Sequence, residues 1–230
     1  MKKHVWFFNA HPDDINAGLA LALVLRDLEE YQIHIVDFTR GERGLSYKKV
    51  PMDECAKIRT AEEYAVCAEL NTEPVFLPQI DGESLVTEEV CSIIEKYFKV
   101  EPPAAVITHW PVDIHADHIM CAGTVMRVLN RKKIDTELYF YRQNQQSRNI
   151  PEDVFFPFDE KIMEEKCRIL KLYACQEGEL IAKRQKIENA CNGFHCKAEY
   201  AECYASFQLP GNNRFFYELD ELRKRRLLLK

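Results

Sequence analysis

The sequence lacks the features that mark membrane, secreted and zinc-finger proteins. Its longest nearly apolar stretch, residues 17–25, is far shorter than the roughly 20 residues that a membrane-spanning helix needs. No cleavage site of small residues follows the N-terminal segment, so we expect a cytoplasmic protein. The nine cysteines include no CxxC pair, and an odd number does not suit a disulfide framework. We therefore expect reduced thiols that mostly fill the core.

An excess of positive charge is also missing. The 230 residues include 31 Lys and Arg against 37 Asp and Glu, which gives a net charge of −6. Such a chain has no overall attraction for nucleic acid or for an anionic membrane, and neither is expected as a partner. The one basic run, residues 223–226, is interpreted as the solvated end of a helix. A small neutral or cationic molecule is the expected partner, and a homo-oligomer is left open.

Apolar runs and helical periodicity alternate along the first 142 residues, and the hydrophobic content of 47% is enough for one sizeable core. The strands are predicted at 5–9, 33–38, 75–77, 104–108 and 138–141. The helices are predicted at 17–30, 52–70, 87–98 and from the end of the loop at 109–117 to about 130. This alternation predicts an α/β fold with a doubly wound, mostly parallel, Rossmann-like sheet. We predict a single domain, 1–230, with a core at 1–142 and a mainly helical C-terminal part at 143–230.

A first polar cluster directly follows the first predicted strand. It consists of His11, Pro12, Asp13 and Asp14. Imidazole and carboxylate groups are suitable zinc ligands, and a second, neighbouring carboxylate can act as a base toward metal-bound water. The alternative is that Asp13 or Asp14 only caps the helix that begins near residue 17. The cluster has neither a GxGxxG nor a GxxxxGK[ST] pattern, so a dinucleotide or P-loop site is not expected.

A second cluster follows the strand at 104–108 and contains Asp113, His115, Asp117 and His118. Histidines three residues apart lie on one face of a helix, and Asp117 between them can hold an imidazole through its ring N–H. Ordinary loop histidines are the alternative. Because the carboxyl ends of parallel strands meet at one edge of a sheet, we predict that both clusters share one metal site. The isolated histidines are interpreted as core residues; they are His4, His34, His109 and His195.

Taken together, the two clusters resemble the signature motifs of the LmbE-like, or PIG-L-type, zinc-dependent N-acetylglucosamine deacetylases. The motifs are His11-Pro12-Asp13-Asp14 and His115-x-Asp117-His118. Other stretches resemble further family motifs in the same order, namely Thr39-Arg40-Gly41-Glu42-Arg43-Gly44, Arg59-x-x-Glu62, Asp81-Gly82, the segment 166–176 and Tyr200-Ala201-Glu202. The resemblance extends over about the whole chain, and the ordered pair of metal motifs makes it specific.

The resemblance implies that His11, Asp14 and His118 bind Zn²⁺ and that Asp13 is the base acting on zinc-bound water. Iron or cobalt suits the same nitrogen and oxygen ligands. His115 is expected to stabilise the oxyanion of the tetrahedral intermediate as an imidazolium, and Asp117 to orient His115.

The resemblance also implies the substrate, an N-acetylated amino sugar or a small conjugate of one, which is hydrolysed to acetate and a free amine. Arg59 and Asp81 match positions that contact the substrate beyond the reacting amide. The alternatives are an ion pair of Arg59 with Glu62 or Glu63, and a plain Asp-Gly turn at Asp81. Glu42 is interpreted as part of the loop architecture. A zinc amidase acting on a larger amide and a sugar-binding protein without activity remain open as functions.

The chain departs from the family pattern at three places. Ile15-Asn16 stands where the family usually has an acid, Ala116 replaces a proline, and Cys175 replaces a serine. None of these residues is an expected ligand or base, so we expect an intact hydrolytic site with an altered pocket shape. Three aromatic residues either stack on a sugar ring or fill the core; they are Trp110, Tyr141 and Tyr173.

Overall fold

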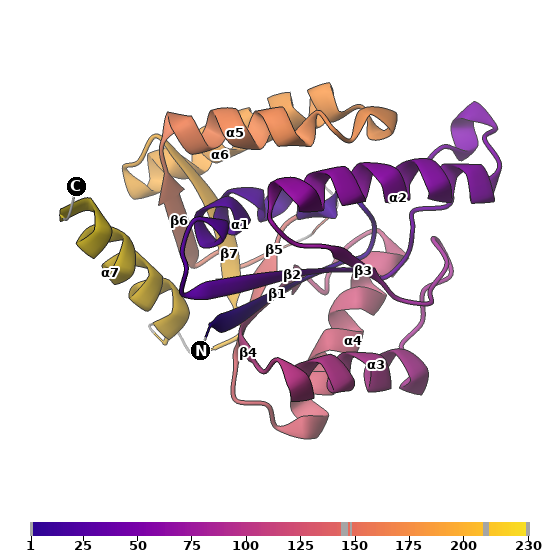
Figure 1. The fold of residues 1–230 in the computed structure, drawn as a ribbon, viewed down its shortest axis with the longest axis horizontal. Coiled ribbons are helices and arrows are strands. Elements are labelled where there is room, and N and C mark those ends of the chain that lie inside the picture. Colours follow the sequence, from indigo (N-terminus) through magenta and orange to yellow (C-terminus); the bar gives the residue numbers. More distant parts are fainter. Residues whose placement is uncertain (1, 144–146, 148, 209–211, 229–230) are drawn as a thin grey trace.

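Seven strands form one mixed sheet in the part of the chain that the computed structural model describes, namely residues 2–143, 147, 149–208 and 212–228. The strands are β1 (Lys3–Asn9), β2 (Tyr31–Asp37), β3 (Pro74–Phe76), β4 (Pro103–His109), β5 (Glu137–Tyr141), β6 (Val154–Phe158) and β7 (Tyr200–Ser206). Their order across the sheet is β3-β2-β1-β4-β5-β7-β6 (Figure 1). β1 to β5 pair in parallel, whereas β7 pairs antiparallel with both β5 and β6.

Helices cover both faces of the sheet. They are α1 (Leu19–Arg26), α2 (Met52–Glu69), α3 (Glu88–Val100), α4 (Ala116–Lys132), α5 (Glu160–Leu170), α6 (Gly178–Cys196) and α7 (Arg214–Leu228), and the short 3-10 helices are η1 (Asp14–Ala17), η2 (Ser46–Lys48) and η3 (Ala174–Gln176). As Figure 1 shows, α3 and α4 lie on one face, and α1, α2, α5 and α6 lie on the other. This is the three-layer arrangement of doubly wound α/β proteins.

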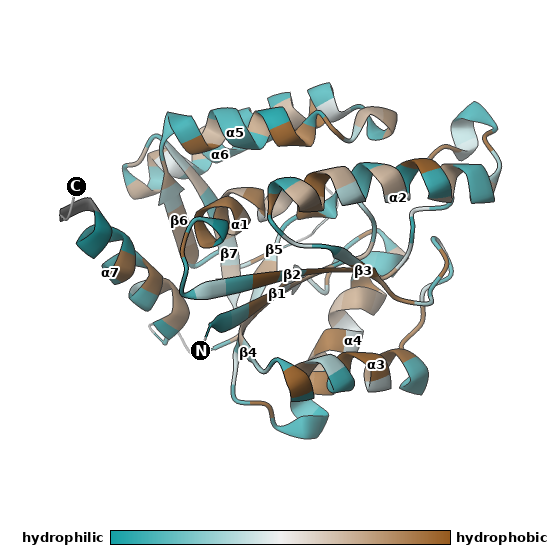
Figure 2. Ribbon diagram, viewed as in Figure 1, coloured by the Kyte–Doolittle hydropathy of each residue, from teal (hydrophilic) through white to brown (hydrophobic). Residues whose placement is uncertain are grey.

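The central strands are apolar on both sides because both sides are covered. In β1, Val5 and Phe7 belong to the core beneath α1 and α5, whereas Trp6 and Phe8 belong to the core beneath α3 and α4. Successive side chains of a strand point to opposite faces, so a continuous apolar run fills two cores at once. Figure 2 shows the hydrophobic residues of β1 and β2 where these strands pass between the helix layers.

The strand order reverses between β1 and β4. After β1 the chain adds β2 and β3 on one side, and it later places β4 and β5 on the other. Asn9 lies opposite Asp37, and Phe8 lies opposite Thr108, so β1, β2 and β4 end at nearly the same level. Doubly wound folds bind ligands at this switch point, just beyond the carboxyl ends of the strands.

The predicted fold class, α/β with a doubly wound and mostly parallel sheet, is confirmed. The described part of 143–230 forms α5, α6 and α7 but also contributes β6 and β7, and the pairing of β5 with β7 carries the sheet through both predicted parts. β7 was missed because the charged Glu202 stands in the middle of it and interrupts the apolar pattern. The first helix is shorter than predicted, since η1 precedes it and the chain must turn back into β2.

The cysteines and the basic C-terminal run lie much as expected. All nine cysteines are free, and five are buried, which agrees with a mainly core-filling role.

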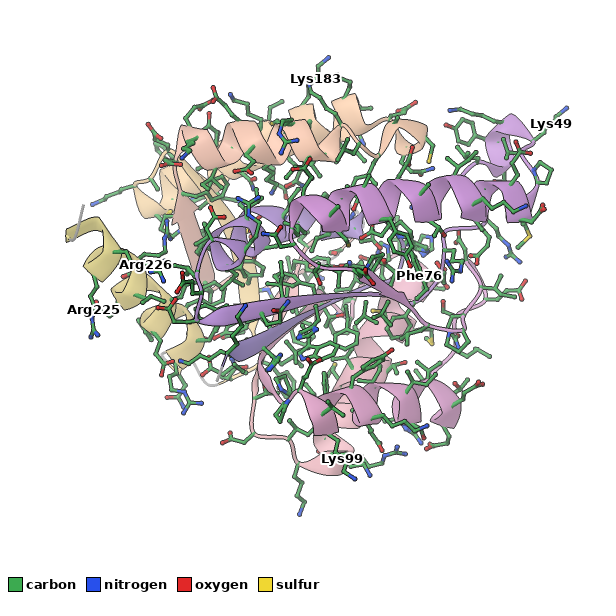
Figure 3. The ribbon with its side chains drawn as sticks, viewed as in Figure 1. Lys49, Phe76, Lys99, Lys183, Arg225 and Arg226 are labelled. Atoms are coloured by element: carbon green, nitrogen blue, oxygen red, sulfur yellow. The ribbon has the colours of Figure 1, made fainter. Side chains whose placement is uncertain are left out.

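On α7, Arg225 points away from the sheet (Figure 3), while Lys224 pairs with Asp220 and Arg226 with Glu30. Within the described residues, the helices are all too short or too polar to cross a membrane.

Candidate active site

A pocket of about 410 Å³ lies at the carboxyl ends of the parallel strands. Its walls come from the segments that follow β1, β2, β3, β4 and β5, and from α2, η3 and the first turn of α4. Seven of the predicted site residues line it, namely His11, Asp13, Asp14, Arg59, Asp81, His115 and His118. The structure therefore brings both predicted clusters, and both predicted substrate-binding residues, to one place.

Asp14 lies between two histidines, one from each motif. Its Oδ2 atom is 3.2 Å from Nδ1 of His11 and 3.7 Å from Nε2 of His118, and all three side chains are buried. The chain turns from β1 into η1, which lets His11 and Asp14 face each other, while His118 comes from the first turn of α4. The three residues that the resemblance assigned as metal ligands thus point toward a common region.

The outer nitrogens of these two histidines lie beside carboxylates. Nε2 of His11 lies 3.0 Å from Asp117, and Nδ1 of His118 lies 3.3 Å from Asp113. Hydrogen bonds outweigh the effect of burial on Asp117 and lower its pKa, because it accepts from His11 and from main-chain N–H groups. A histidine whose far nitrogen meets a carboxylate is the usual arrangement around protein-bound metals, since the carboxylate orients the ring.

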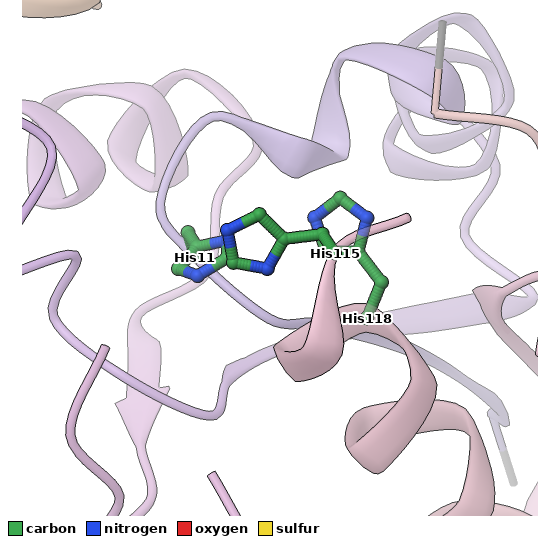
Figure 4. Close-up of side chains that lie close together, drawn as sticks. All are labelled: His11, His115 and His118. Atoms are coloured by element: carbon green, nitrogen blue, oxygen red, sulfur yellow. The ribbon is translucent and has the colours of Figure 1, made fainter. Parts of the chain in front are cut away.

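His115 completes a group of three histidines with His11 and His118 (Figure 4). One ring nitrogen of each lies within 4.8 Å of the others. Nδ1 of His115 is buried and has no hydrogen-bond partner among the described residues. With Asp14, these side chains form a set of nitrogen and oxygen donors of the kind found in catalytic zinc sites. The residues present therefore fit a divalent metal ion.

Asp13 is held from both sides in an unusual backbone conformation. Its φ is 92°, in the left-handed region. The Arg59 guanidinium donates to the Asp13 carboxylate and to the Pro12 carbonyl, and Asn16 Nδ2 donates to the Asp13 carbonyl at 2.7 Å. Burial raises the pKa of Asp13 to about 7, although Arg59 lowers it. A carboxylate with a pKa near neutrality is suited to take up and release a proton.

Arg59 points to the metal motif rather than along its own helix. Glu62 accepts from the main chain of Cys175 at 2.8 Å, and Glu63 accepts from Tyr173 at 2.7 Å, so neither forms the alternative pair with Arg59. A Cβ atom at Gly41 would lie 2.3 Å from the guanidinium, so the loop after β2 can pass Arg59 only with glycine there. Arg59 lines the pocket and holds Asp13 at the same time.

Asp81 also has two partners in the site. Its Oδ1 lies 3.3 Å from Nε2 of His11, and its Oδ2 accepts from the main chain of Arg43 at 2.9 Å. The turn that presents it needs Gly82, whose φ is 79°. Glu42 accepts from the main-chain N–H of Asp81 at 3.0 Å, which agrees with a role in loop architecture. Asp81 thus forms the predicted turn and also lines the pocket.

The expected contact between Asp117 and His115 is corrected by the structure. Asp117 accepts from His11 and from the main-chain N–H groups of Gly82 and Ser84. Residues two apart at the start of a helix point in different directions, and α4 begins at Ala116. Burial, with the neighbouring His11 and His118, lowers the pKa of His115, which favours a neutral imidazole over the expected imidazolium.

His109 is buried, as expected, but it lies against the metal motifs. Its ring stacks on His118 with centroids 4.0 Å apart, and its Nε2 lies 3.2 Å from Asp14. The main-chain N–H of Ala10 donates to the same nitrogen at 3.0 Å, which occupies its lone pair. His109 therefore supports the site from behind. In the sequence, its place at the carboxyl end of a strand indicated that it could lie at the site.

Other residues near the pocket were not predicted, or were predicted differently. Asp113, which belongs to the second predicted cluster but was given no role of its own, touches His118. Gln143 lines the pocket from beyond the end of β5, where no motif of histidines and carboxylates stands in the sequence, together with Arg43 and Gln176. The aromatic candidates are packed in the interior or against it: Tyr141 and Tyr173 are buried, and Trp110 packs on Phe140.

Comparison with known proteins decides the family. Residues 6–129, more than half of the chain, match the family described as GlcNAc-PI de-N-acetylase, or PIG-L. The chain belongs to the PIG-L family. The segment that matches the PIG-L family contains both metal motifs, Arg59 and Asp81, and it ends within α4.

A curated relative is similar to this chain over a comparable stretch. A protein of Bacillus subtilis (strain 168), described as probable N-acetyl-alpha-D-glucosaminyl L-malate deacetylase 2, is 26% identical over an alignment of 140 residues that covers 58% of this chain and 63% of that protein. The matched segment therefore spans less than two thirds of that relative.

Solved structures show the same fold at low sequence identity. An N,N'-diacetylchitobiose deacetylase from Pyrococcus horikoshii has a TM-score of 0.75 and 19% identity, covering 94% of this chain and 85% of that one. The 4-carboxy-2-hydroxymuconate hydratase GalB from Pseudomonas putida KT2440 has a TM-score of 0.73 and 17% identity, covering 90% of this chain and 97% of that one. Because deacetylase and hydratase share this fold, the fold alone does not determine the reaction.

Proposed function

We propose that this chain is a metal-dependent hydrolase that removes the N-acetyl group from an N-acetylglucosamine-type amino sugar or from a small conjugate of one. The observation that carries the proposal is the position of Asp13. Its side chain is next in sequence to the ligand candidate Asp14, is held by Arg59, and lines the same pocket as both metal motifs. Hydrolysis of an amide by water needs a base in this position.

His11, Asp14 and His118 would hold the metal ion, which we take to be Zn²⁺. Fe²⁺ suits the same donors. When bound, the ion polarises the amide carbonyl and lowers the pKa of a water molecule toward ~7. Asp117 and Asp113 keep the two ligand histidines oriented through their outer nitrogens.

The remaining steps belong to the side chains of the pocket. Asp13 accepts a proton from the attacking water as the water oxygen bonds to the amide carbon. His115 donates a hydrogen bond to the oxygen on which negative charge develops. Asp13 then passes its proton to the amide nitrogen as the carbon–nitrogen bond breaks. The second proton of the water leaves with the carboxyl group and passes to the released amine, so the products are acetate and the protonated amine, and atoms and protons balance.

The substrate is inferred from the walls of the pocket. Arg43, Asp81, Gln143 and Gln176 present donors and acceptors beyond the metal motifs, which suits the hydroxyl groups of a sugar. The names of the Bacillus relative and of the Pyrococcus deacetylase point to N-acetylated amino sugars as well. A small N-acetylated amino sugar is therefore the proposed substrate. We propose the cytoplasm as the location.

The test is release of free amine from N-acetylglucosamine and from its small glycosides by the Zn²⁺-loaded protein. We expect the natural chain to release amine and acetate in equal amounts. Asp13→Ala should keep the metal of this site and lower kcat by about 10²- to 10⁴-fold. His118→Ala should lose that metal, because one of its ligands is removed. Asp53→Ala, at an exposed position of α2, is the matched control and should behave like the natural chain.

Three outcomes would overturn parts of the proposal. A near-normal kcat in Asp13→Ala would exclude Asp13 as the base. Cleavage of larger amides, without release of amine from any acetylated sugar, would make the protein an amidase of a different class. Binding of acetylated sugars without turnover by the metal-loaded protein would leave a sugar-binding protein without activity.

A further inference from the structure

A second group of possible metal ligands lies at the opposite end of the sheet from the pocket. His4 is near the start of β1, His34 is in the neighbouring strand β2, and Glu101 directly follows α3. Nδ1 of His4 is 2.9 Å from Nε2 of His34, and Nδ1 of His34 is 3.7 Å from Oε2 of Glu101. One donor atom from each of the three residues lies within 4.8 Å of the others.

The surroundings hold these side chains in place. Trp6 stacks on the ring of His34 with centroids 4.0 Å apart and an angle of 14° between the planes. The Trp6 indole N–H donates to the main-chain carbonyl of Glu101 at 3.2 Å, which ties that residue to β1. The side chain of His34 is 15% exposed, and that of Glu101 is 38% exposed, so the group opens to solvent on one side.

We propose that His4, His34 and Glu101 form a second metal site, separate from the active site, that takes Zn²⁺ or a similar divalent transition-metal ion. Two imidazoles and one carboxylate are good ligands for such ions, and the open side leaves a position for water. Two nitrogens that bind one zinc ion tetrahedrally are roughly 3.4 Å apart. The present 2.9 Å therefore requires only a small movement of the rings, with the ion replacing the proton between them.

A metal ion at this place would join three segments of the chain. It would connect β1, β2 and the residue that leads into β4, and the other ends of these strands carry the residues of the pocket. The ion would be far from the reacting amide, so its role would be to stabilise the fold. A hydrogen bond between two neutral histidines, with no metal affinity, is the competing explanation.

The experiment is a calorimetric titration of the full chain, freed of metal by a chelator, with Zn²⁺ alone. The natural chain is expected to bind two ions and His118→Ala one. His118→Ala combined with His34→Gln is expected to bind none, whereas His118→Ala combined with His195→Gln should still bind one. His195 is the matched control, because it lies against Phe155 and Phe194.

Glu101→Gln provides an independent check if His34→Gln does not fold. In the His118→Ala background it should weaken Zn²⁺ binding about 10- to 100-fold, since a carboxylate ligand is replaced by a neutral amide. Absence of Zn²⁺ binding in folded His118→Ala would overturn the proposal, and so would unchanged binding after both His34→Gln and Glu101→Gln. Because the readout is metal binding, the result does not depend on the proposed enzymatic activity.

Discussion

Asp13 has a backbone conformation that residues other than glycine rarely adopt. Its φ of 92° carries a steric cost of roughly 1 kcal/mol or more. Such strain persists only where the surroundings hold the residue firmly, and here Arg59 holds the side chain while Asn16 holds the carbonyl. Strained residues of this kind gather at functional sites, where the conformation aims a side chain. The conformation of Asp13 thus agrees with the proposed role as a base.

Replacing Arg59 by lysine should lower kcat about 10- to 100-fold with little change in KM. Lysine keeps the charge, but one ammonium group cannot hold both the Asp13 carboxylate and the Pro12 carbonyl, and a slightly misplaced base has an effect of this size. Steady-state kinetics with parallel metal analysis measures this. Arg40→Lys, at an exposed position beside Phe76, is the control. A higher KM at unchanged kcat would instead indicate a direct contact of Arg59 with the substrate.

At the scale of elements, a series of hydrogen bonds between buried side chains links helices α5 and α6 to the loop after β1. Lys166 of α5 donates to Gln185 of α6 at 2.9 Å, Gln185 donates to Asn16 at 3.0 Å, and Asn16 donates to the carbonyl of Asp13 at 2.7 Å. Asn16 stands where the family usually has an acid. An amide can donate to one neighbour and accept from the other, which a carboxylate cannot do. Asparagine at position 16, in place of the usual acid, can therefore accept from Gln185 of α6 and donate to the carbonyl of Asp13.

Asn16→Asp should lower kcat about tenfold or more while the metal stays bound. The substitution removes the donor to the Asp13 carbonyl and leaves two oxygens facing each other. The matched control is Asn189→Asp, because Asn189 accepts from the same Lys166 at 2.9 Å and a carboxylate there keeps that bond. Activity and metal content of the two variants are compared at equal folded fractions. Equal losses in both would mean that the change acts through general stability and not through Asp13.

At the scale of the whole molecule, a buried ion pair joins helix α5 to β7, in the antiparallel part of the sheet. Glu202 of β7 accepts from Lys166 at 2.7 Å and from the main-chain N–H groups of Ala20 and Leu21, at the start of α1. Both charged side chains are fully shielded from solvent. The C-terminal segment therefore completes the sheet and also fixes the helix that follows the first metal motif.

Lys166→Met should lower the free energy of unfolding by about 3 kcal/mol, because the Glu202 carboxylate would be left in the interior without its cation. Urea denaturation at neutral pH measures the change. Lys186→Met, which removes an exposed ion pair with Glu160, should leave the midpoint nearly unchanged. If both variants unfolded at the same urea concentration as the natural chain, the buried pair would contribute nothing to stability.

Much of the fold was predictable, because its elements are built from local patterns. The first strand, predicted at 5–9, lies at Lys3–Asn9, and the long helix predicted at 52–70 lies at Met52–Glu69. The antiparallel strands were missed. β7 carries the buried charge of Glu202, and partners distant in the sequence, Lys166 and the start of α1, stabilise that charge in the core.

The sequence by itself determined which candidate ligand and base residues the chain carries and the strand ends near which they lie, since both motifs are short and each stands in the segment after a strand. The tertiary structure alone decided which side chains meet. Asp117 faces His11 instead of His115, Arg59 reaches Asp13 instead of a glutamate on its own helix, and His109 lies behind Asp14. The physical reason is that these contacts join segments far apart in the chain, so they depend on how helices and strands pack and not on local spacing.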